Sequence, residues 1–221
     1  MRSSFQATTC RMFDVLAAAL GLMTLSPLLT AIAVAIKLQD GGPVFYSQWR
    51  VGRNFEPFRL HKFRSMVPNA DRLGPLLTSR EDRRLTRLGQ LLRRYKLDEL
   101  PQLINVIKGD MQLVGARPEV ERYVSMFPEE YTAILMDRPG ITDPASVAFR
   151  HEEQLFGTGN PEQEYVGKIL PAKLKISREY ARRRDFVSDL MVIFGTVFSM
   201  TRLLAWVKAE IAKAPSPEIQ T

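Results

Sequence analysis

The sequence predicts a mainly α-helical fold of the α+β class, with one small β-hairpin and an N-terminal membrane anchor. Three observations support this class: a long apolar run near the N-terminus, two short strand-like segments around a turn, and helical spacing of apolar residues further along. A chain of 221 residues can bury one core and is too short for a polytopic transporter. Its single cysteine, Cys10, excludes an intramolecular disulfide framework.

The predicted anchor is the run Met12–Ile36, which carries one charge, Asp14. This run exceeds the roughly 20 apolar residues that cross a bilayer. Ser26 and Pro27 lie near its middle, where proline kinks a helix and the serine hydroxyl can bond a freed carbonyl. Both flanks are basic, and basic flanks stay cytoplasmic. We therefore expect residues 1–38 to form a re-entrant helix-break-helix that enters and leaves on one membrane face. A kinked spanning helix and a signal peptide are the alternatives.

Short strands and helices are predicted after the anchor. The strands are Val44–Arg50 and Phe55–Phe63, on either side of a turn. The helices are Thr86–Tyr95, Glu99–Lys108, Lys168–Arg184 and Asp189–Val207, with Gly109 closing the second and Pro139-Gly140 marking a loop. We expect residues 39–207 to form a cytoplasmic catalytic domain with interfacial helices, and residues 208–221 to form a flexible tail.

The net charge of +7 is unevenly distributed along the chain. Residues 50–96 hold 13 Lys/Arg against 4 Asp/Glu, whereas residues 119–164 hold 3 against 10. A basic surface attracts phosphates, whether of nucleic acid, anionic lipid or a phosphorylated small molecule, and charge alone does not choose among these. Only two histidines, His61 and His151, are present, so we expect any metal to be a hard cation held by oxygens.

The run Leu97–Asn105 carries the clearest chemical signal, since the chain has no P-loop, no dinucleotide-binding glycine motif, no HExxH and no GxSxG. Pro101 is tolerated in a helix's first turn, so it places Asp98 and Glu99 at a helix N-terminus. Free N–H groups there keep a carboxylate ionised and favour phosphate. An N-capping Asp followed by a helix-starting Glu is the structural alternative.

Basic residues from several segments accompany this carboxylate pair. Carboxylates inside a basic cluster suit phosphoryl transfer, in which positioning and charge neutralisation contribute most. Arginine also grips phosphate oxygens through two bonds at once. We therefore expect phosphate or substrate contacts from a set drawn from these segments and from the run itself: Lys62, Arg64, Arg93, Gln102, Asn105 and Arg117.

Several motifs, in order along the chain, carry a resemblance to a known family. They are Phe13-Asp14, Ser26-Pro27, Gly42–Gly52, Lys62–Met66, Leu97–Val106, Lys108–Met111 and Val114–Pro118. Together they resemble the bacterial sugar transferases, the monotopic polyprenyl-phosphate phosphoglycosyl transferases. The resemblance runs from about Arg11 to Thr142, with a weaker match to Met200.

The resemblance implies transfer of a sugar 1-phosphate from a nucleotide diphosphate sugar, usually a UDP-sugar, to undecaprenyl phosphate. This is the initiating membrane step of bacterial polysaccharide or glycoconjugate synthesis. The resemblance implies that Asp98 is the nucleophile, that Glu99 helps hold Mg²⁺, and that Arg93 and Arg117 grip phosphate. It also implies the bacterial inner membrane, with the catalytic domain on the cytoplasmic face against inner-membrane lipids, and it leaves a homodimer open.

Two departures from the family pattern concern specificity. Ala116 stands where Pro is commoner, and residues 143–147 lie where many relatives have a Trp-containing stretch, so the donor sugar is not determined. The rival from another class is a membrane-anchored basic adaptor that binds nucleic acid or anionic lipid. That rival gives Asp98 and Glu99 no task, and no nucleic-acid-binding motif is present, so we expect no nucleic-acid partner. A catalytically inactive relative is a second rival.

Overall fold

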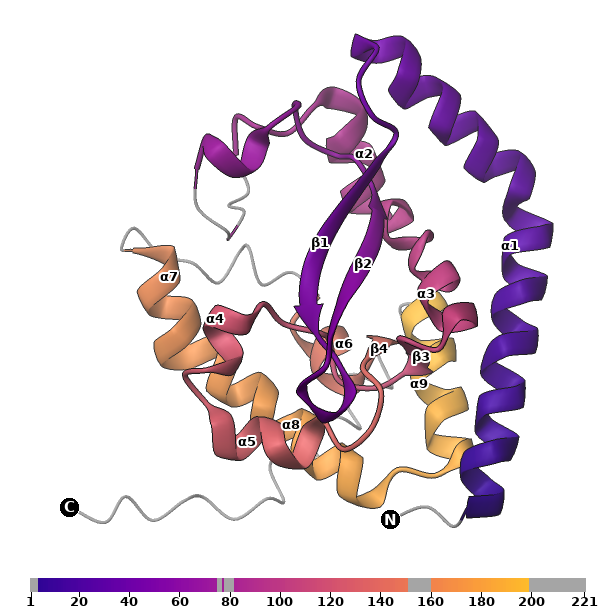
Figure 1. Cartoon of the computed structure of the whole chain (residues 1–221), viewed down its shortest axis with the longest axis vertical. Helices are drawn as coiled ribbons and strands as arrows, with labels where there is room; N and C mark the ends of the chain where they lie inside the picture. The colour runs from indigo at the N-terminus through magenta and orange to yellow at the C-terminus, as the bar shows by residue number, and fades with distance from the viewer. Residues whose placement is uncertain (1–3, 75–76, 78–81, 151–159, 199–221) are drawn as a thin grey trace.

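A computed structural model describes residues 4–74, 77, 82–150 and 160–198. Its longest element is α1 (Ser4–Asp40), a single helix of 37 residues that contains Pro27 and bends along its length (Figure 1). The predicted break at Ser26-Pro27 is wrong as an interruption of helical structure. The reason is local, because proline leaves only the carbonyl of Met23 without its usual donor, and the Ser26 hydroxyl donates to that carbonyl at 2.8 Å.

The length and composition of α1 fit a membrane anchor. Residues 7–40 are long and apolar enough to cross a membrane by these two criteria. The helix also ends two residues beyond the predicted boundary at 38.

The predicted hairpin is confirmed. Strands β1 (Phe45–Val51) and β2 (Pro57–Phe63) pair antiparallel in the register Phe45↔Phe63 to Val51↔Pro57. The 3-10 turn Arg53–Phe55 connects them. Phe58 and Leu60 of β2 are buried, and the same face of the strand carries Lys62, since side chains alternate along a strand. Lys62 therefore lies on the same face of β2 as the buried residues Phe58 and Leu60, next to the end of the strand.

The region of the carboxylate pair is divided differently from the prediction. Helix α2 (Arg87–Arg94) matches the predicted helix, and Thr86 caps its N-terminus with a side chain that accepts from the Gly89 N–H. The next helix, α3 (Gln102–Lys108), begins three residues later than predicted, and Leu97–Glu99 form a separate 3-10 turn. Pro101 has no N–H with which to join the preceding turn to α3, so two short elements replace one helix. Gly109 ends α3 at φ 98°, as predicted.

A second sheet was not predicted from the sequence. Strands β3 (Gln112–Val114) and β4 (Gly140–Thr142) pair in parallel, although Pro139-Gly140 was predicted to be a loop. Three residues are too few to show an alternating pattern. Gly140 lies so close to Gly115 that a Cβ on Gly140 would come within 2.1 Å of the Gly115 nitrogen, so the pairing requires glycine there.

The remaining helices pack mainly against one another, with α4 also contacting β1 and α9 contacting β3 and β4. They are α4 (Glu121–Val124), α5 (Pro128–Ile134), α6 (Pro144–Ala148), α7 (Pro161–Glu164), the π-helical turn Tyr165–Ile169, α8 (Leu170–Arg183) and α9 (Phe186–Phe198). The predicted basic helix is confirmed in α8 and the predicted apolar helix in α9. The residues of that apolar prediction beyond 198, and the predicted tail 208–221, lie outside the described residues.

The anchor shares its core with the rest of the chain. Ala18 of α1 is buried with Phe58, Leu60, Val106 and Met111. Nearer its other end, Ile32 and Ile36 are buried with Phe63 and Leu92. In Figure 1 the lower half of α1 runs beside α3 and α9. The described residues therefore form a mainly helical α+β structure in which the anchor helix is one wall of the core.

Candidate active site

The carboxylate pair lies in the 3-10 turn that links α2 to α3. Lys96 begins this turn in the left-handed region, at φ 58°, and Pro101 closes it before α3 starts. Both carboxylates are buried, with Asp98 only 4% exposed. Because α3 begins at Gln102, Asp98 lies outside its first turn, and the expectation of a carboxylate on free helix N–H groups is wrong.

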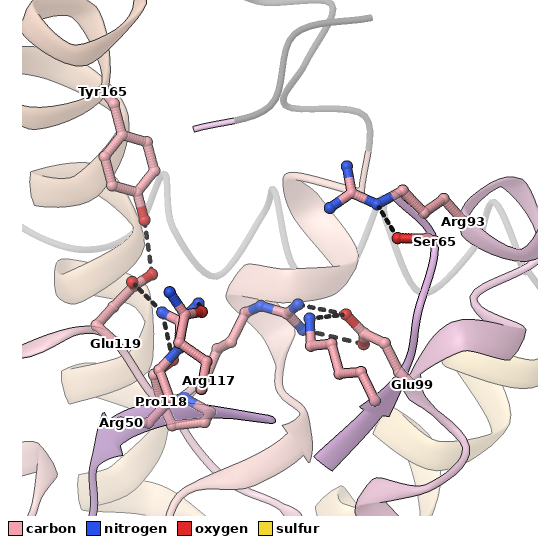
Figure 2. A network of polar contacts seen from close by, with 10 residues as sticks. Arg50, Ser65, Arg93, Glu99, Arg117, Pro118, Glu119 and Tyr165 are labelled. Atoms are coloured by element: carbon pink, nitrogen blue, oxygen red, sulfur yellow. Dashed lines mark hydrogen bonds and ion pairs between the residues drawn. The ribbon is translucent and has the colours of Figure 1, made fainter. Parts of the chain in front are cut away.

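Glu99 is paired with two cations from distant segments. Lys62 of β2 donates to its Oε1 at 3.1 Å. Arg117, which follows β3, donates from Nη1 to Oε2 at 3.1 Å and from Nη2 to Oε1, so its fork grips both oxygens (Figure 2). Burial opposes ionisation of Glu99, but Arg117 and Lys62 outweigh it and hold the pKa of Glu99 well below its usual range.

Asp98 has the opposite electrostatic environment. Its Oδ1 is buried and has no hydrogen-bond partner among the residues that the structure describes. Burial raises the pKa of Asp98, and so does the neighbouring charge of Glu99. Lys62 and Arg93 act in the other direction without reversing the shift. Asp98 is therefore a buried acid with one oxygen that no described group satisfies, and such perturbed groups gather at functional sites.

Arg93 and Gln102 also lie at this site, in different states. The Arg93 Nε donates to the Ser65 hydroxyl at 3.2 Å (Figure 2), and the charge of Arg93 is close enough to Asp98 to act on its pKa. Gln102 is buried, and its Nε2 has no acceptor within the described ranges. A buried amide N–H without an acceptor destabilises the fold. Such groups usually have an explanation, and a hydrogen bond to a bound molecule would be one.

Two predicted site residues are not brought into this cluster. Arg64 pairs with Asp40 at the end of α1. Asn105 is fully buried and ties α3 to the hairpin, since its Nδ2 donates to the Arg59 carbonyl at 2.7 Å and its Oδ1 accepts from the His61 N–H at 3.0 Å. Arg64 and Asn105 are therefore placed as structural contacts in the observed arrangement.

A second buried cluster next to Arg117 was missed by sequence reasoning. Glu119 accepts from Arg50 at 3.1 Å and from the Tyr165 hydroxyl at 2.7 Å, while its backbone carbonyl accepts from the Val51 N–H at 3.0 Å (Figure 2). Burial opposes its ionisation, but Arg50 and Lys173 hold the pKa of Glu119 below its usual value. Arg50 lies within the motif Gly42–Gly52 and Glu119 follows the motif Val114–Pro118, but nothing in a separation of 69 residues signals that the two side chains pair.

The donor set fits Mg²⁺ only in a shared site. Within the described part of the chain, no three His, Cys, Asp or Glu side chains lie close enough to hold a metal ion. Both oxygens of Glu99 already accept from cations, whereas one oxygen of Asp98 is unsatisfied. Mg²⁺ commonly binds through one or two carboxylates together with substrate phosphates and water, so these residues fit it when phosphate oxygens complete the shell.

Fold and site together define a class: a protein with a long apolar N-terminal helix that fits a membrane anchor, and a buried carboxylate pair among cations, an arrangement suited to phosphorylated substrates. Comparison with known proteins places it more closely. The bacterial sugar transferase family matches residues 5–203, and the chain belongs to that family. The predicted resemblance is thereby confirmed.

Three relatives illustrate the range of the family. The chain is 36% identical over 192 residues to UDP-N-acetylgalactosamine-undecaprenyl-phosphate N-acetylgalactosaminephosphotransferase of Aeromonas hydrophila, covering 85% of this chain and 42% of that protein. It is 33% identical over 202 residues to exopolysaccharide production protein ExoY of Sinorhizobium fredii, covering 85% and 83%. It is 44% identical over 193 residues to UDP-glucose:undecaprenyl-phosphate glucose-1-phosphate transferase of Caulobacter vibrioides, covering 86% and 68%.

These relatives differ in length, and this chain spans less than half of the Aeromonas protein but most of the other two. Their names include transferases of sugar phosphates to undecaprenyl phosphate and a protein of exopolysaccharide production. Family membership supports the predicted enzyme class, a phosphoglycosyl transferase.

Proposed function

We propose that this chain transfers a sugar 1-phosphate from a UDP-sugar to undecaprenyl phosphate, through a covalent intermediate on Asp98. The observation that carries the proposal is the asymmetry of the carboxylate pair: Glu99 is neutralised by two cations, and Asp98 has a buried oxygen without a partner among the described residues. The names of the Aeromonas and Caulobacter relatives support both donor and acceptor. The product would initiate polysaccharide or glycoconjugate synthesis.

The proposed reaction has two displacements at one phosphorus. In the first, an Asp98 carboxylate oxygen attacks the phosphorus that bears the sugar, and the bond from this phosphorus to the bridging oxygen breaks, releasing UMP. In the second, a phosphate oxygen of undecaprenyl phosphate attacks the same phosphorus. The acyl-phosphate bond then breaks, and Asp98 returns to its starting carboxylate. Arg93, Arg117 and Lys62 supply positive charge around the phosphoryl oxygens.

The test is to replace Asp98 with asparagine. Asp98→Asn keeps the size of the side chain but is a poor nucleophile, so turnover should be abolished. Incubation with a UDP-sugar panel and no acceptor should add one phosphosugar mass to the wild type and none to the variant. Asp137→Asn, at an exposed carboxylate, is the matched control and should behave as the wild type. Full activity in Asp98→Asn would refute the assignment, and salt-sensitive nucleic-acid binding without UMP release would instead support the adaptor.

A magnesium requirement is part of the proposal. Glu99, together with the donor diphosphate, would hold Mg²⁺, which when bound neutralises the diphosphate and stabilises the leaving group. EDTA should therefore stop UMP release, and Mg²⁺ or Mn²⁺ should restore it. Activity that persists through chelation, or that depends on Zn²⁺, would count against this site.

The re-entrant topology and the cytoplasmic face of the inner membrane also belong to the proposal. Contacts at the two ends of α1 support it: Arg11 donates to the carbonyls of Val106 and Met111 at 2.6 and 3.1 Å, and Asp40 pairs with Arg64. Both ends of α1 thus contact the same part of the chain, which favours the proposal that they share one membrane face.

Labelling in intact cells tests this topology. Ser3→Cys and Asn54→Cys, each in a Cys10→Ala background, should resist a membrane-impermeant maleimide and react after lysis. Labelling of position 3 in intact cells would show that α1 spans the membrane.

A further inference from the structure

Two arginines that the proposed reaction does not use are each held through one nitrogen. Arg53, in the hairpin turn, donates its Nε to the Met136 carbonyl at 3.0 Å. Arg138, which precedes β4, donates its Nε to the Gly109 carbonyl at 2.7 Å. The two terminal nitrogens of each side chain have no partner among the described residues. Arg53 is exposed and Arg138 is half-buried, so both side chains present an oriented pair of N–H groups to solvent.

This arrangement is also that of Arg93 in the candidate active site. The Nε of Arg93 is bonded to the Ser65 hydroxyl, and its two terminal nitrogens point away from that bond (Figure 2). A guanidinium that is fixed through Nε keeps two parallel N–H groups for the two oxygens of a phosphate, which is the bidentate geometry of arginine–phosphate pairs. Arg53 and Arg138 are therefore oriented as phosphate-binding arginines commonly are.

A third arginine, Arg11 of α1, lies beside Arg138. It donates to the Val106 carbonyl at 2.6 Å and to the Met111 carbonyl at 3.1 Å. Its Nη2 would lie 3.6 Å from a Cβ on Gly109, the residue whose carbonyl Arg138 bonds. Arg11 and Arg138 thus meet at the C-terminal end of α3, and Arg53 bonds the carbonyl two residues before Arg138.

The charges of these three arginines are not neutralised by an ion pair. No carboxylate forms one with Arg11, Arg53 or Arg138 in the part of the chain that the structure describes. Burial lowers the pKa of Arg138, and the charges of Arg11 and Arg53 lower it further, against a smaller opposing effect of Asp137 and Asp14. The backbone carbonyls that they bond carry only partial charge. An anion bound among the three would relieve their mutual repulsion.

The place of these arginines in the fold indicates where a phosphate would come from. Arg11 directly precedes the apolar run 12–36, so it lies where α1 enters the membrane in the proposed topology. Met12 beside it and Met136, two residues before Arg138, are exposed. Basic residues next to exposed apolar side chains are typical of a surface at the headgroup level, where lipids supply phosphate groups.

We propose that Arg11, Arg53 and Arg138 form a binding site for the phosphate group of an anionic membrane lipid. The terminal N–H pairs of Arg53 and Arg138 would donate to the phosphate oxygens, and Arg11 would add positive charge. Occupancy would tie the hairpin turn and the end of α3 to the lipid surface. The inference rests on the proposed seating of α1 in the membrane and is independent of the transfer reaction.

The test measures lipid binding by the full chain in detergent, with native mass spectrometry counting the lipids that stay bound. The probes are short-chain phosphatidylglycerol, which is anionic, short-chain phosphatidylcholine, which is zwitterionic, and inorganic phosphate. The wild type should retain one phosphatidylglycerol at concentrations at which it retains no phosphatidylcholine. Inorganic phosphate at equal concentration should not displace the bound lipid.

Substitutions locate the site. Arg53→Gln and Arg138→Gln each remove one charge and one donor pair, so each should weaken phosphatidylglycerol binding by about 10- to 100-fold, as expected when hydrogen bonds to a charged group are lost. Arg138→Lys keeps the charge without the paired donors and should also bind more weakly than the wild type. Arg122→Gln is the matched control. Arg122 is exposed on α4, across the hairpin from α1 (Figure 1), and its loss should leave binding unchanged.

Several outcomes would overturn the proposal. One is unchanged binding in Arg53→Gln, which removes an exposed turn residue and so decides the question even where Arg138→Gln alters folding. Another is an equal loss in Arg122→Gln, which would indicate general attraction of a basic protein to anionic lipid. Displacement by equal inorganic phosphate would refute the assignment to a lipid. Binding is measured without substrates, so failure of the proposed function, read from UMP release, and of the topology, read from labelling at position 3, are scored separately.

Discussion

The Asp98–Glu99 turn and the Glu119 cluster lie on either side of Arg117 and use the same kinds of residue (Figure 2). In the Glu119 cluster, each carboxylate oxygen accepts from a named side chain, Arg50 or Tyr165. In the turn, Glu99 is equally well paired, but Asp98 is buried beside it with an oxygen that no described residue satisfies. Both carboxylate oxygens of Glu119 thus have hydrogen-bond donors. In the turn, one acid, Glu99, has donors for both oxygens, and the other, Asp98, has an oxygen without a donor among the described residues.

This difference indicates how the chain combines stability with reactivity. A buried carboxylate is tolerated when cations and hydrogen-bond donors surround it, as at Glu119 and Glu99. An unmatched carboxylate is held in place only because the surrounding structure compensates for it, and such groups gather at functional sites. The cations around Glu99 therefore neutralise Glu99 and leave an oxygen of Asp98 without a partner.

After the loss of the Asp98 nucleophile, the largest effect on turnover should come from Arg117, the residue between the two regions. Arg117→Lys keeps the charge but loses the two-pronged grip on Glu99 and on a phosphoryl group. We expect turnover to fall by about 10²- to 10³-fold, as when one donor to a transition-state oxygen is removed. Steady-state UMP release measures the effect. Arg122→Lys, in an exposed pair with Glu162, is the control, and equal losses in both variants would contradict the assigned role.

Removal of Glu119 should affect stability more than chemistry. Glu119→Ala leaves Arg50 buried without its carboxylate, and breaking such a pair costs about 3–5 kcal/mol of unfolding free energy. Glu179→Ala, in an exposed pair with Arg183, should cost about 1 kcal/mol or less. Denaturant unfolding in detergent compares the two variants. Similar losses would mean that the Glu119 cluster is no more than a surface contact.

The smallest effect should be the change in thermal stability of Asp98→Asn. The sign of this change tests whether Asp98, unlike Glu99, is destabilised by ionisation. The folded-state pKa of Asp98 is raised, so its ionisation destabilises the fold at pH values above the unfolded pKa. Asparagine removes that cost, and Tm at pH 7 should rise, by roughly 2–4 °C for each kcal/mol relieved. The gain should shrink as the pH falls toward the unfolded-state value of about 3.9.

Glu99→Gln should behave in the opposite way. Since the pKa of Glu99 is lowered in the folded state, its ionised form contributes stability that is present above the unfolded pKa and lost as the pH falls. The variant should therefore lower Tm at pH 7. Shifts of the same sign for Asp98→Asn and Glu99→Gln would show that the two neighbours share one environment.

Local patterns predicted the elements with a strong periodicity or a distinctive residue. The hairpin, α2, α8 and the start of α9 follow from alternation and helical spacing, and Gly109 ends α3 where expected. The errors have equally local causes. Pro101 separates a 3-10 turn from α3, the carbonyl freed by Pro27 is satisfied by Ser26 so that α1 continues, and β3 and β4 are too short to show a period.

The sequence by itself determined the anchor, the family and the carboxylate pair, because each depends on residues that are close together in the chain. Only the tertiary structure decided which acid is neutralised. Glu99 meets Lys62 and Arg117 across 37 and 18 residues, while Arg64, which is equally basic and only two residues from Lys62, turns to Asp40. The identity of a charged residue does not indicate which residue it pairs with. The pairing is decided by how the strands and helices pack.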